Sequence, residues 1–359
     1  MTARIPPSRR ALVAPAGLLV ALGTAAAQEE RPLNVCASVP SLGSIAGEVG
    51  GDRVSVTTFA KGGENPHFLD ARPSFVKLLS TADLYLQQGM DLEAGWAPLL
   101  LRQCRRAQVQ PGAPGFLDLS GVVEAREIPQ GPVDRSHGDV HPLGNPHYMT
   151  DPLHGIAVAR AIRDRLRELD PAKASGFDRR CAAFERTVCA ALAGEKLAAE
   201  FPTDTIVKLA RLHETGELGR FLERQGRLGD LGGWLAAMLP HRGIRAITDH
   251  SQWVYFGRRF GLELVGCLEP KPGIAPTTSH LGELVRDAPR QGVRLVITSP
   301  GFDPRSAEFV ASRTGTRLLV LAPEVGAIEG VDTYVKMIDY DVRQVVSALQ
   351  DARPAEGRR

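Results

Sequence analysis

The sequence predicts an α/β protein with two lobes, each built on a central, mostly parallel sheet flanked by helices, and a long rigid helix that joins them. Two observations support this prediction. Short β-rich apolar runs alternate with helical patterns, which is typical of parallel sheets covered by helices. Residues 171–201 hold a helical pattern much longer than the usual length of about 11–12 residues. A helix of that length between two α/β halves indicates a strut.

Seven strands are expected. They span residues 33–38, 54–59, 84–87, 244–248, 263–268, 295–299 and 318–321. Helices are expected at residues 41–49, 74–79, 91–105, 151–169 and 331–349, in addition to the strut. Residues 126–143 are rich in Gly, Pro, Asp and His and predict a loop.

These elements predict the domain boundaries of the chain. We expect a signal peptide at 1–27, an N-terminal α/β lobe at 28–169 and a connecting helix at 170–201. A C-terminal α/β lobe follows at 202–351, with a helical insert at 205–240, and a polar tail occupies 352–359.

The N-terminus indicates export. Arg4, Arg9 and Arg10 precede an apolar stretch that ends in small residues before Gln28, which is typical of a cleaved signal peptide and predicts a periplasmic location. The 43 basic and 41 acidic side chains nearly balance, so nucleic acid is not an expected partner. The five cysteines include no CxxC motif, and we expect them to be buried as small hydrophobic residues.

Three of the nine histidines share a setting. His67, His147 and His250 each come just after an expected strand or at a helix start, where the carboxyl edge of a parallel sheet offers a crevice. Asn-Pro-His occurs twice, and its proline restricts the backbone beside the imidazole. Any one of these residues alone would be interpreted as a turn residue. Their shared position predicts a metal site.

The flanking residues make the pattern specific. The motifs are Asn65-Pro66-His67-Phe68 with Arg72-Pro73-Ser74, then Asn145-Pro146-His147-Tyr148 with Asp151-Pro152, and His250 with Tyr255-Phe256 and Phe260-Gly261-Leu262. From about residue 33 to 349 the chain resembles the zinc/manganese-type substrate-binding proteins of bacterial ABC transporters, the ZnuA/TroA-type family. The resemblance implies two lobes joined by a long helix, with one metal ion bound between them. It also implies delivery to a membrane permease, no enzymatic activity, and a monomer.

The resemblance leaves the fourth ligand open. Many members of the family supply an aspartate near the C-terminus, where this chain has Pro323 followed by Glu324. Manganese-type relatives use a glutamate near the position of Glu269, which ends an expected strand in the same lobe as His250. We expect Glu269 as the fourth ligand, with Glu324 or water as the alternatives.

Ligand type favours zinc. Three imidazoles suit Zn²⁺, whereas Mn²⁺ prefers more carboxylate oxygen, so Mn²⁺ or Fe²⁺ comes second. The loop that holds His137 and His141 offers a weak secondary metal site, although a solvated loop is the default interpretation.

Two other functions fit parts of the pattern. A zinc hydrolase could use three histidines and an open water position, with Glu269 or Asp249 as the base. A metal-binding surface adhesin would also be exported. The sequence contains no GxSxG or HExxH motif, so a binding protein for metal uptake is the favoured interpretation.

Overall fold

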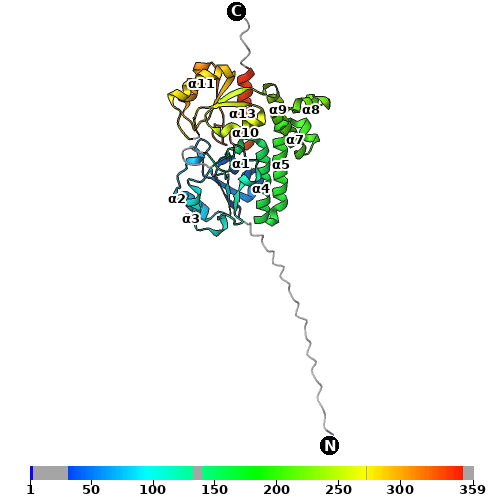
Figure 1. The fold of residues 1–359 in the computed structure, drawn as a ribbon. Helices are drawn as coiled ribbons and strands as arrows, with labels where there is room; N and C mark the ends of the chain where they lie inside the picture. The colour runs from blue at the N-terminus through cyan, green and yellow to red at the C-terminus, as the bar shows by residue number, and fades with distance from the viewer. Residues whose placement is uncertain (3–30, 132–139, 272, 351–359) are drawn as a thin grey trace, which may run out of the picture. The chain divides into compact units, whose positions relative to one another are not determined.

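Two four-stranded parallel sheets organise the protein in the computed structural model (Figure 1). The first sheet holds β1 (Leu33–Ala37), β2 (Val54–Thr58), β3 (Leu84–Gln87) and β4 (Phe116–Asp118) in the order β2-β1-β3-β4. The second holds β5 (Arg245–Thr248), β6 (Glu263–Cys267), β7 (Val293–Thr298) and β8 (Arg317–Val320) in the order β6-β5-β7-β8. The two sheets therefore share one topology, and the expected α/β fold with two lobes is confirmed.

The structure describes residues 1–2, 31–131, 140–271 and 273–350. Apart from Met1 and Thr2, the expected signal peptide lies outside these residues, as does the tail at 352–359. Among the helices that the structure describes, none combines the length and apolar character needed to cross a membrane.

The seven expected strands lie within two residues of their expected bounds. Strand β4 was not expected, because three residues beside a Gly- and Pro-rich stretch are too few to show a period of two. The register of the first sheet pairs Val35 of the central strand with Val56 on one side and Leu84 on the other.

Helices cover both faces of each sheet. In the N-terminal lobe they are α1 (Pro40–Gly50), α2 (Pro73–Ser80), α3 (Ala97–Cys104) and α4 (Pro152–Leu169). In the C-terminal lobe they are α10 (Val254–Phe260), α11 (Thr278–Gln291) and α12 (Pro304–Thr314), and α13 (Tyr334–Gln350) ends the described chain. The helix expected at 91–105 begins late, because Met90 and Asp91 have φ of 51° and 62° and turn the backbone before α3.

The single helix expected across residues 171–201 is divided. The structure has α5 (Ala174–Ala193) and α6 (Glu195–Glu200), separated by Gly194 with φ of 87°. A Cβ at Gly194 would lie 2.7 Å from Cα of Gly232, so a close approach of backbone requires glycine there. Helix α5 still contacts both α1 and α4 of the N-terminal lobe and the segment that precedes β5 (Figure 1).

The expected insert is helical. It contains α7 (Thr203–Thr215), α8 (Leu218–Arg224) and α9 (Gly233–Met238). Helix α7 packs against α5 and α10, and α9 packs against α5 and α13.

The buried apolar side chains form three clusters. One lies on the outer face of the first sheet under α2 and α3, and another lies on the outer face of the second sheet under α11 and α12. The largest is continuous through the inner helices of both lobes and α13. The five cysteines are free. Four of them are buried, as expected, whereas Cys267 is only partly buried.

Alanine substitutions at two helical glycines, one of them a control, test the packing between α4 and α13. A Cβ at Gly155 would lie 2.2 Å from Cε1 of the buried Tyr334, whereas a Cβ at Gly47 in α1 would meet nothing within 4 Å. We expect Gly155→Ala to lower the free energy of unfolding by about 1–3 kcal/mol through overpacking. Gly47→Ala should raise it by about 0.5–1 kcal/mol through helix propensity alone.

Urea unfolding of both variants gives the measurement. A stabilised Gly155→Ala variant would contradict the tight contact with Tyr334.

Candidate metal site

Three histidines from three different loops meet at the carboxyl ends of the two sheets. His67 lies in a short 3-10 turn (Pro66–Phe68) after β2, and His147 directly precedes the turn that leads into α4. His250 follows β5 after one intervening residue. The structure therefore brings together the three histidines that the sequence singled out, two from the first lobe and one from the second.

Both Asn-Pro-His tripeptides fold into the same turn. Oδ1 of Asn65 accepts the backbone N–H of His67 at 3.0 Å, and Oδ1 of Asn145 accepts that of His147 at 2.9 Å. These are Asx turns, in which the asparagine bonds the backbone two residues further on. Because the intervening proline also has a fixed φ, the backbone that carries each imidazole has little freedom.

The proline carbonyl groups of these turns are also held. Nε1 of Trp96 donates to the carbonyl oxygen of Pro66 at 2.9 Å. Nε2 of Gln88 donates to that of Pro146 at 2.5 Å, and Gln88 is itself buried. Neither Trp96 nor Gln88 was expected from the sequence to support the site, because neither lies near a histidine in the chain.

A buried carboxylate holds the third histidine. Asp249 accepts the backbone N–H of His250 at 2.7 Å and the indole N–H of Trp253 at 3.1 Å through Oδ1, and the hydroxyl of Ser299 at 2.7 Å through Oδ2. Burial raises the pKa of Asp249, and the hydrogen bond from Ser299 is the largest effect that opposes the rise. An aspartate or asparagine side chain thus fixes the backbone of all three histidines.

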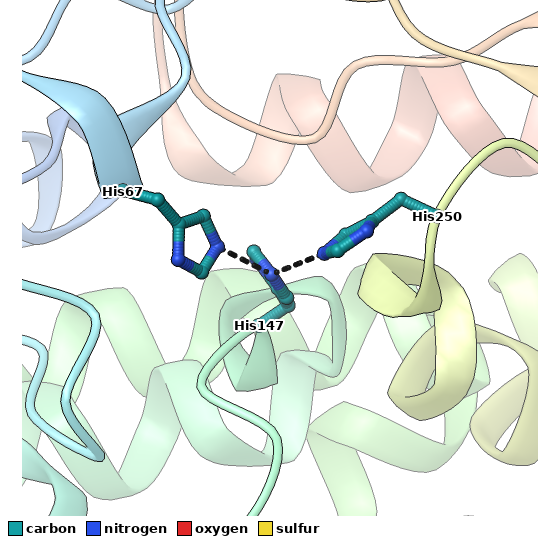
Figure 2. A group of neighbouring side chains, drawn as sticks. All are labelled: His67, His147 and His250. Carbon is teal, nitrogen blue, oxygen red and sulfur yellow. Dashed lines mark hydrogen bonds between the residues drawn. The ribbon is translucent and has the colours of Figure 1, made fainter. Parts of the chain in front are cut away.

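The three imidazoles point their Nε2 atoms at one another (Figure 2). Nε2 of His147 lies 3.1 Å from Nε2 of His67 and 3.3 Å from Nε2 of His250. Among the described residues, these three form a group whose ligand atoms all lie within 4.8 Å of one another. A tetrahedral zinc ion with Zn–N bonds of about 2.0–2.1 Å separates neighbouring nitrogens by about 3.3 Å. The observed separations therefore suit one small tetrahedral ion.

Glu269 contacts the opposite nitrogen of His250. Its Oε2 lies 2.7 Å from Nδ1 of His250 and also accepts the backbone N–H of Gly273 at 2.9 Å. A carboxylate at Nδ1 favours the tautomer whose lone pair is on Nε2 and orients that nitrogen. The structure does not bring Glu269 into the group of three Nε2 atoms.

Glu324 lines the same cavity as the histidines. This cavity is small, about 40 Å³, and Ser299 and Phe302 also line it. Oε2 of Glu324 accepts the backbone N–H of Ser41 at 2.9 Å and also the Ser41 hydroxyl. Burial raises the pKa of Glu324 to about 7. The carboxyl group therefore lies beside the three histidines but bonds to α1.

The loop before the second motif reaches the edge of the site. The ring centroid of His141 lies 5.0 Å from that of His67. His141 is not in the group of three ligand atoms. His137, the other histidine of this loop, lies outside the described residues.

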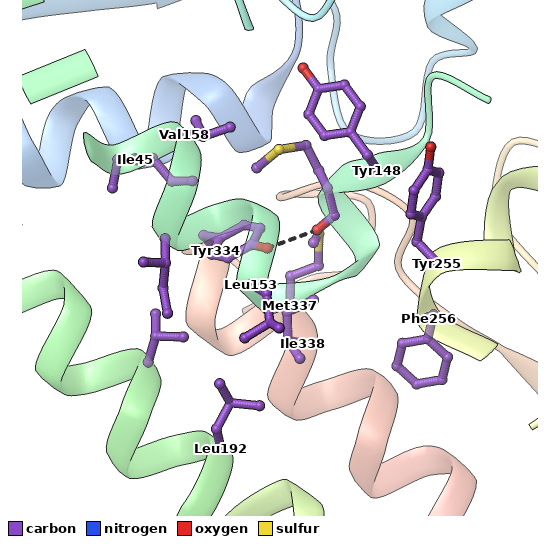
Figure 3. Close-up of a cluster of buried hydrophobic side chains, with 14 of the residues drawn as sticks. Ile45, Tyr148, Leu153, Val158, Leu192, Tyr255, Phe256, Tyr334, Met337 and Ile338 are labelled. Carbon is purple, nitrogen blue, oxygen red and sulfur yellow. Dashed lines mark hydrogen bonds between the residues drawn. The ribbon is translucent and has the colours of Figure 1, made fainter. Parts of the chain in front are cut away.

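The core fixes the chain just after His147 (Figure 3). The hydroxyl of Tyr148 donates to the carbonyl oxygen of Gln88 at 2.6 Å. The hydroxyl of Tyr334, at the start of α13, donates to the carbonyl oxygen of Met149 at 2.9 Å. The last helix of the described chain thus supports the loop that carries a site residue, a contact without any local sequence signal.

Electrostatics keep the central imidazole neutral. Burial is the main cause that lowers the pKa of His147 well below its ordinary value, followed by the charges that His67 and His250 would carry if protonated. A neutral imidazole is the form that binds a metal ion.

The protein matches a known family over most of its length. The family described as the periplasmic component A of the zinc-uptake complex matches residues 35–200 and 223–348. The chain belongs to this family. Residues 201–222, which include α7, lie between the two matched segments.

Relatives are named for different metals. The chain is 24% identical to the high-affinity zinc uptake system protein ZnuA of Yersinia pestis, over 88% of this chain and 91% of the relative. It is 21% identical to the manganese-binding lipoprotein MntA of Halalkalibacterium halodurans, over 91% of each chain. The iron-binding protein YfeA of Yersinia pestis is 25% identical over 91% of this chain and 92% of the relative.

Solved structures share the fold. A ZnuA deletion mutant with zinc bound superposes with a TM-score of 0.63 and 20% identity, covering 88% of this chain and 98% of that one. A mutant laminin-binding adhesin of Streptococcus agalactiae gives a TM-score of 0.64 and 18% identity, covering 88% and 99%.

The lowered pKa of His147 predicts its titration in the metal-free protein. In an unfolded chain a histidine gains its proton near pH 6.5. Because folding lowers this pKa, the His147 ring should stay neutral as the pH falls through 6, and the folded protein should lose stability below about pH 6.5.

Ring ¹⁵N chemical shifts of the metal-free protein report the protonation of His147 directly. A charged His147 ring at pH 6 in the folded protein would contradict this account.

Proposed function

We propose that the protein captures a divalent transition-metal ion between its two lobes and delivers it to the membrane permease of an ABC transporter for uptake. The observation that carries this proposal is the convergence of three Nε2 atoms, from both lobes, at separations that suit one tetrahedral ion. Membership of the zinc-uptake family supports the same function.

Zinc is the ion that the donor set favours. Imidazole nitrogen suits Zn²⁺, whereas Mn²⁺ favours carboxylate and water oxygen. Relatives named for zinc, manganese and iron all match this chain, so Mn²⁺ or Fe²⁺ is the second candidate.

We propose His67, His147 and His250 as the ligands. The contact of Glu269 with Nδ1 of His250 favours an orienting role for this carboxylate over direct ligation. The fourth position then falls to water or to Glu324, which lines the cavity.

The size of the cavity supports binding over catalysis. Sites for organic ligands usually measure about 300–1,000 Å³. A cavity of about 40 Å³ suits an ion with little room for an organic substrate beside it. We therefore favour a metal carrier over a zinc hydrolase.

We propose that the protein works as a monomer in the periplasm after removal of residues 1–27. The signal-peptide pattern supports export. The family description names a periplasmic component, and MntA is named a lipoprotein, which supports a location outside the cytoplasm. The partner in this role is the permease of the transporter.

Metal analysis of purified protein tests the ligand set. The unmodified protein should bind about one equivalent of Zn²⁺, and replacing any of His67, His147 or His250 by Ala should weaken binding by at least about 100-fold, because each removes a direct bond to the ion. His280→Ala is the matched control, since His280 bonds to the carbonyl oxygen of Cys267 instead. Stoichiometric tight binding by all three ligand variants would refute the site.

Two glutamine variants distinguish the roles of the carboxylates. Glu269→Gln should weaken zinc binding by about 10–100-fold, because the amide holds the His250 tautomer less firmly. Glu324→Gln should leave the affinity within about threefold if water completes the coordination shell.

Competition with a chromophoric chelator measures both dissociation constants. A loss in Glu324→Gln as large as that of a histidine variant would assign Glu324 as the fourth ligand.

A further inference from the structure

The segment between the two family-matched regions contacts both lobes. Residues 201–222 are mainly α7, which packs against α10, the helix that follows His250. Nδ1 of the buried His213 on α7 donates to the carbonyl oxygen of Arg259 at 3.0 Å, and Nη1 of Arg259 donates to the carbonyl oxygen of Ala210 at 2.7 Å. Helix α7 is therefore anchored to the C-terminal lobe.

One carboxylate of α7, that of Glu214, forms ion pairs with arginines from both lobes. Oε1 of Glu214 accepts Nη2 of Arg126, from the N-terminal lobe, at 3.2 Å. The same oxygen accepts Nε and Nη2 of Arg258 on α10 at 2.9 and 2.6 Å. Oε2 of Glu214 accepts Nη2 of Arg259 at 3.4 Å. Glu214 thus pairs with arginines of both lobes, in addition to the pairs of Asp204 with Arg160 and of Arg211 with Glu124 that also join α7 to the N-terminal lobe.

The same network reaches the loops of the metal site. Arg259 forms two hydrogen bonds of 2.9 Å with Asp151, and both side chains are only about 5% exposed. Asp151 is four residues after His147 and caps α4. The chain of contacts from Glu214 through Arg259 to Asp151 therefore joins the insert to the segment that carries one ligand.

A second link joins the segments of His147 and His250 directly. Nδ2 of Asn145 donates to the carbonyl oxygen of Ser251 at 2.8 Å, and the hydroxyl of Tyr255 donates to the carbonyl oxygen of Asn145 at 2.8 Å. The Tyr255 hydroxyl in turn accepts the backbone N–H of Arg126 at 2.9 Å. Arg126 thus contacts both this link and Glu214.

We infer that residues 201–222 brace the two lobes in the metal-free protein, with Glu214 as a positioning residue for the metal site. The three histidines come from both lobes, so any separation of the lobes separates the ligands. A brace that holds the lobes together before the ion binds reduces the conformational entropy that the protein loses on binding. The lower entropy cost raises the affinity for the ion and slows its release.

The brace combines one buried ion pair, Arg259 with Asp151, with the pair of Glu214 and Arg258, which lies nearer the solvent. Four arginines, Arg126, Arg211, Arg258 and Arg259, face three carboxylates, which are Glu124, Asp151 and Glu214. A cleft of about 390 Å³ between α4, α7 and α10 is lined by these side chains. Added salt can therefore enter and screen the pairs of Glu214, whose Arg258 partner is half exposed. Metal release should then depend on ionic strength.

The test rests on the proposed function and uses the full-length mature protein. Glu214→Gln should speed the dissociation of Zn²⁺ on the order of tenfold, because changes in such a network alter coupling by that order. In the unmodified protein, dissociation should accelerate with added sodium nitrate, and in Glu214→Gln this salt dependence should largely disappear. Glu214→Asp should restore part of the slow release.

The matched control is Glu217→Gln. Glu217 lies three residues further on and bonds to Arg220, an exposed side chain. This variant should release zinc at the rate of the unmodified protein. Arg126→Gln, which removes the partner of Glu214 in the N-terminal lobe without changing α7, should reproduce the effect of Glu214→Gln.

A second measurement, on the metal-free protein, tests the brace independently of the proposed metal binding. Nitroxide labels at Lys77 on α2 and Glu283 on α11, both exposed, report the distance between the lobes. The distribution of distances should broaden in Glu214→Gln and not in Glu217→Gln. If the unmodified protein bound no metal, the proposed function would fail, while this measurement would still test the brace.

The brace is overturned if Glu214→Gln keeps the narrow distance distribution. It is also overturned if zinc dissociation and its salt dependence are unchanged. A fall in melting temperature alone, without either effect, would assign Glu214 an ordinary structural role.

Discussion

Three imidazole nitrogens, from loops of two different sheets, have to lie about 3 Å apart, and much of the local bonding serves this single constraint. Imidazole nitrogens packed so closely cannot all be charged, so the site favours neutral rings that an ion can join together. Asx turns fix the backbone of His67 and His147, and side chains from other elements hold the proline carbonyls before them. Asp249 accepts the backbone N–H of His250. The site is therefore preorganised by contacts that do not involve the ion.

Two carboxyl groups lie close to the three histidines. Glu269 lies behind His250, and Glu324 is bonded to α1. Because burial raises the pKa of Glu324 to about 7, this carboxyl group is partly protonated at neutral pH. In the proposed site, neutral imidazole nitrogen supplies three of the donors, and water or Glu324 supplies the fourth.

The two lobes are coupled more closely than a simple hinge would require. One apolar cluster runs through the inner helices of both lobes, and α13 supports the loop after His147 through Tyr334. The buried pair of Asp151 and Arg259 joins the lobes near the three histidines, and Glu214 extends this coupling into a segment that the family model does not match. Movement between the lobes is thus constrained by packing and by paired charge.

Much of this protein followed from sequence alone. Alternating short strands and helices predicted two parallel sheets, because few other folds can bury the apolar faces of such alternating elements. The histidine motifs identified three residues that the structure brings together. Local pattern could not detect the break at Gly194, which depends on the approach of Gly232 from a distant loop. The sequence placed Glu269 near His250, but only the tertiary structure decided which ring nitrogen it contacts. Periodicity and motifs record what each segment prefers locally, whereas the choice of partner depends on how loops far apart in the chain pack together.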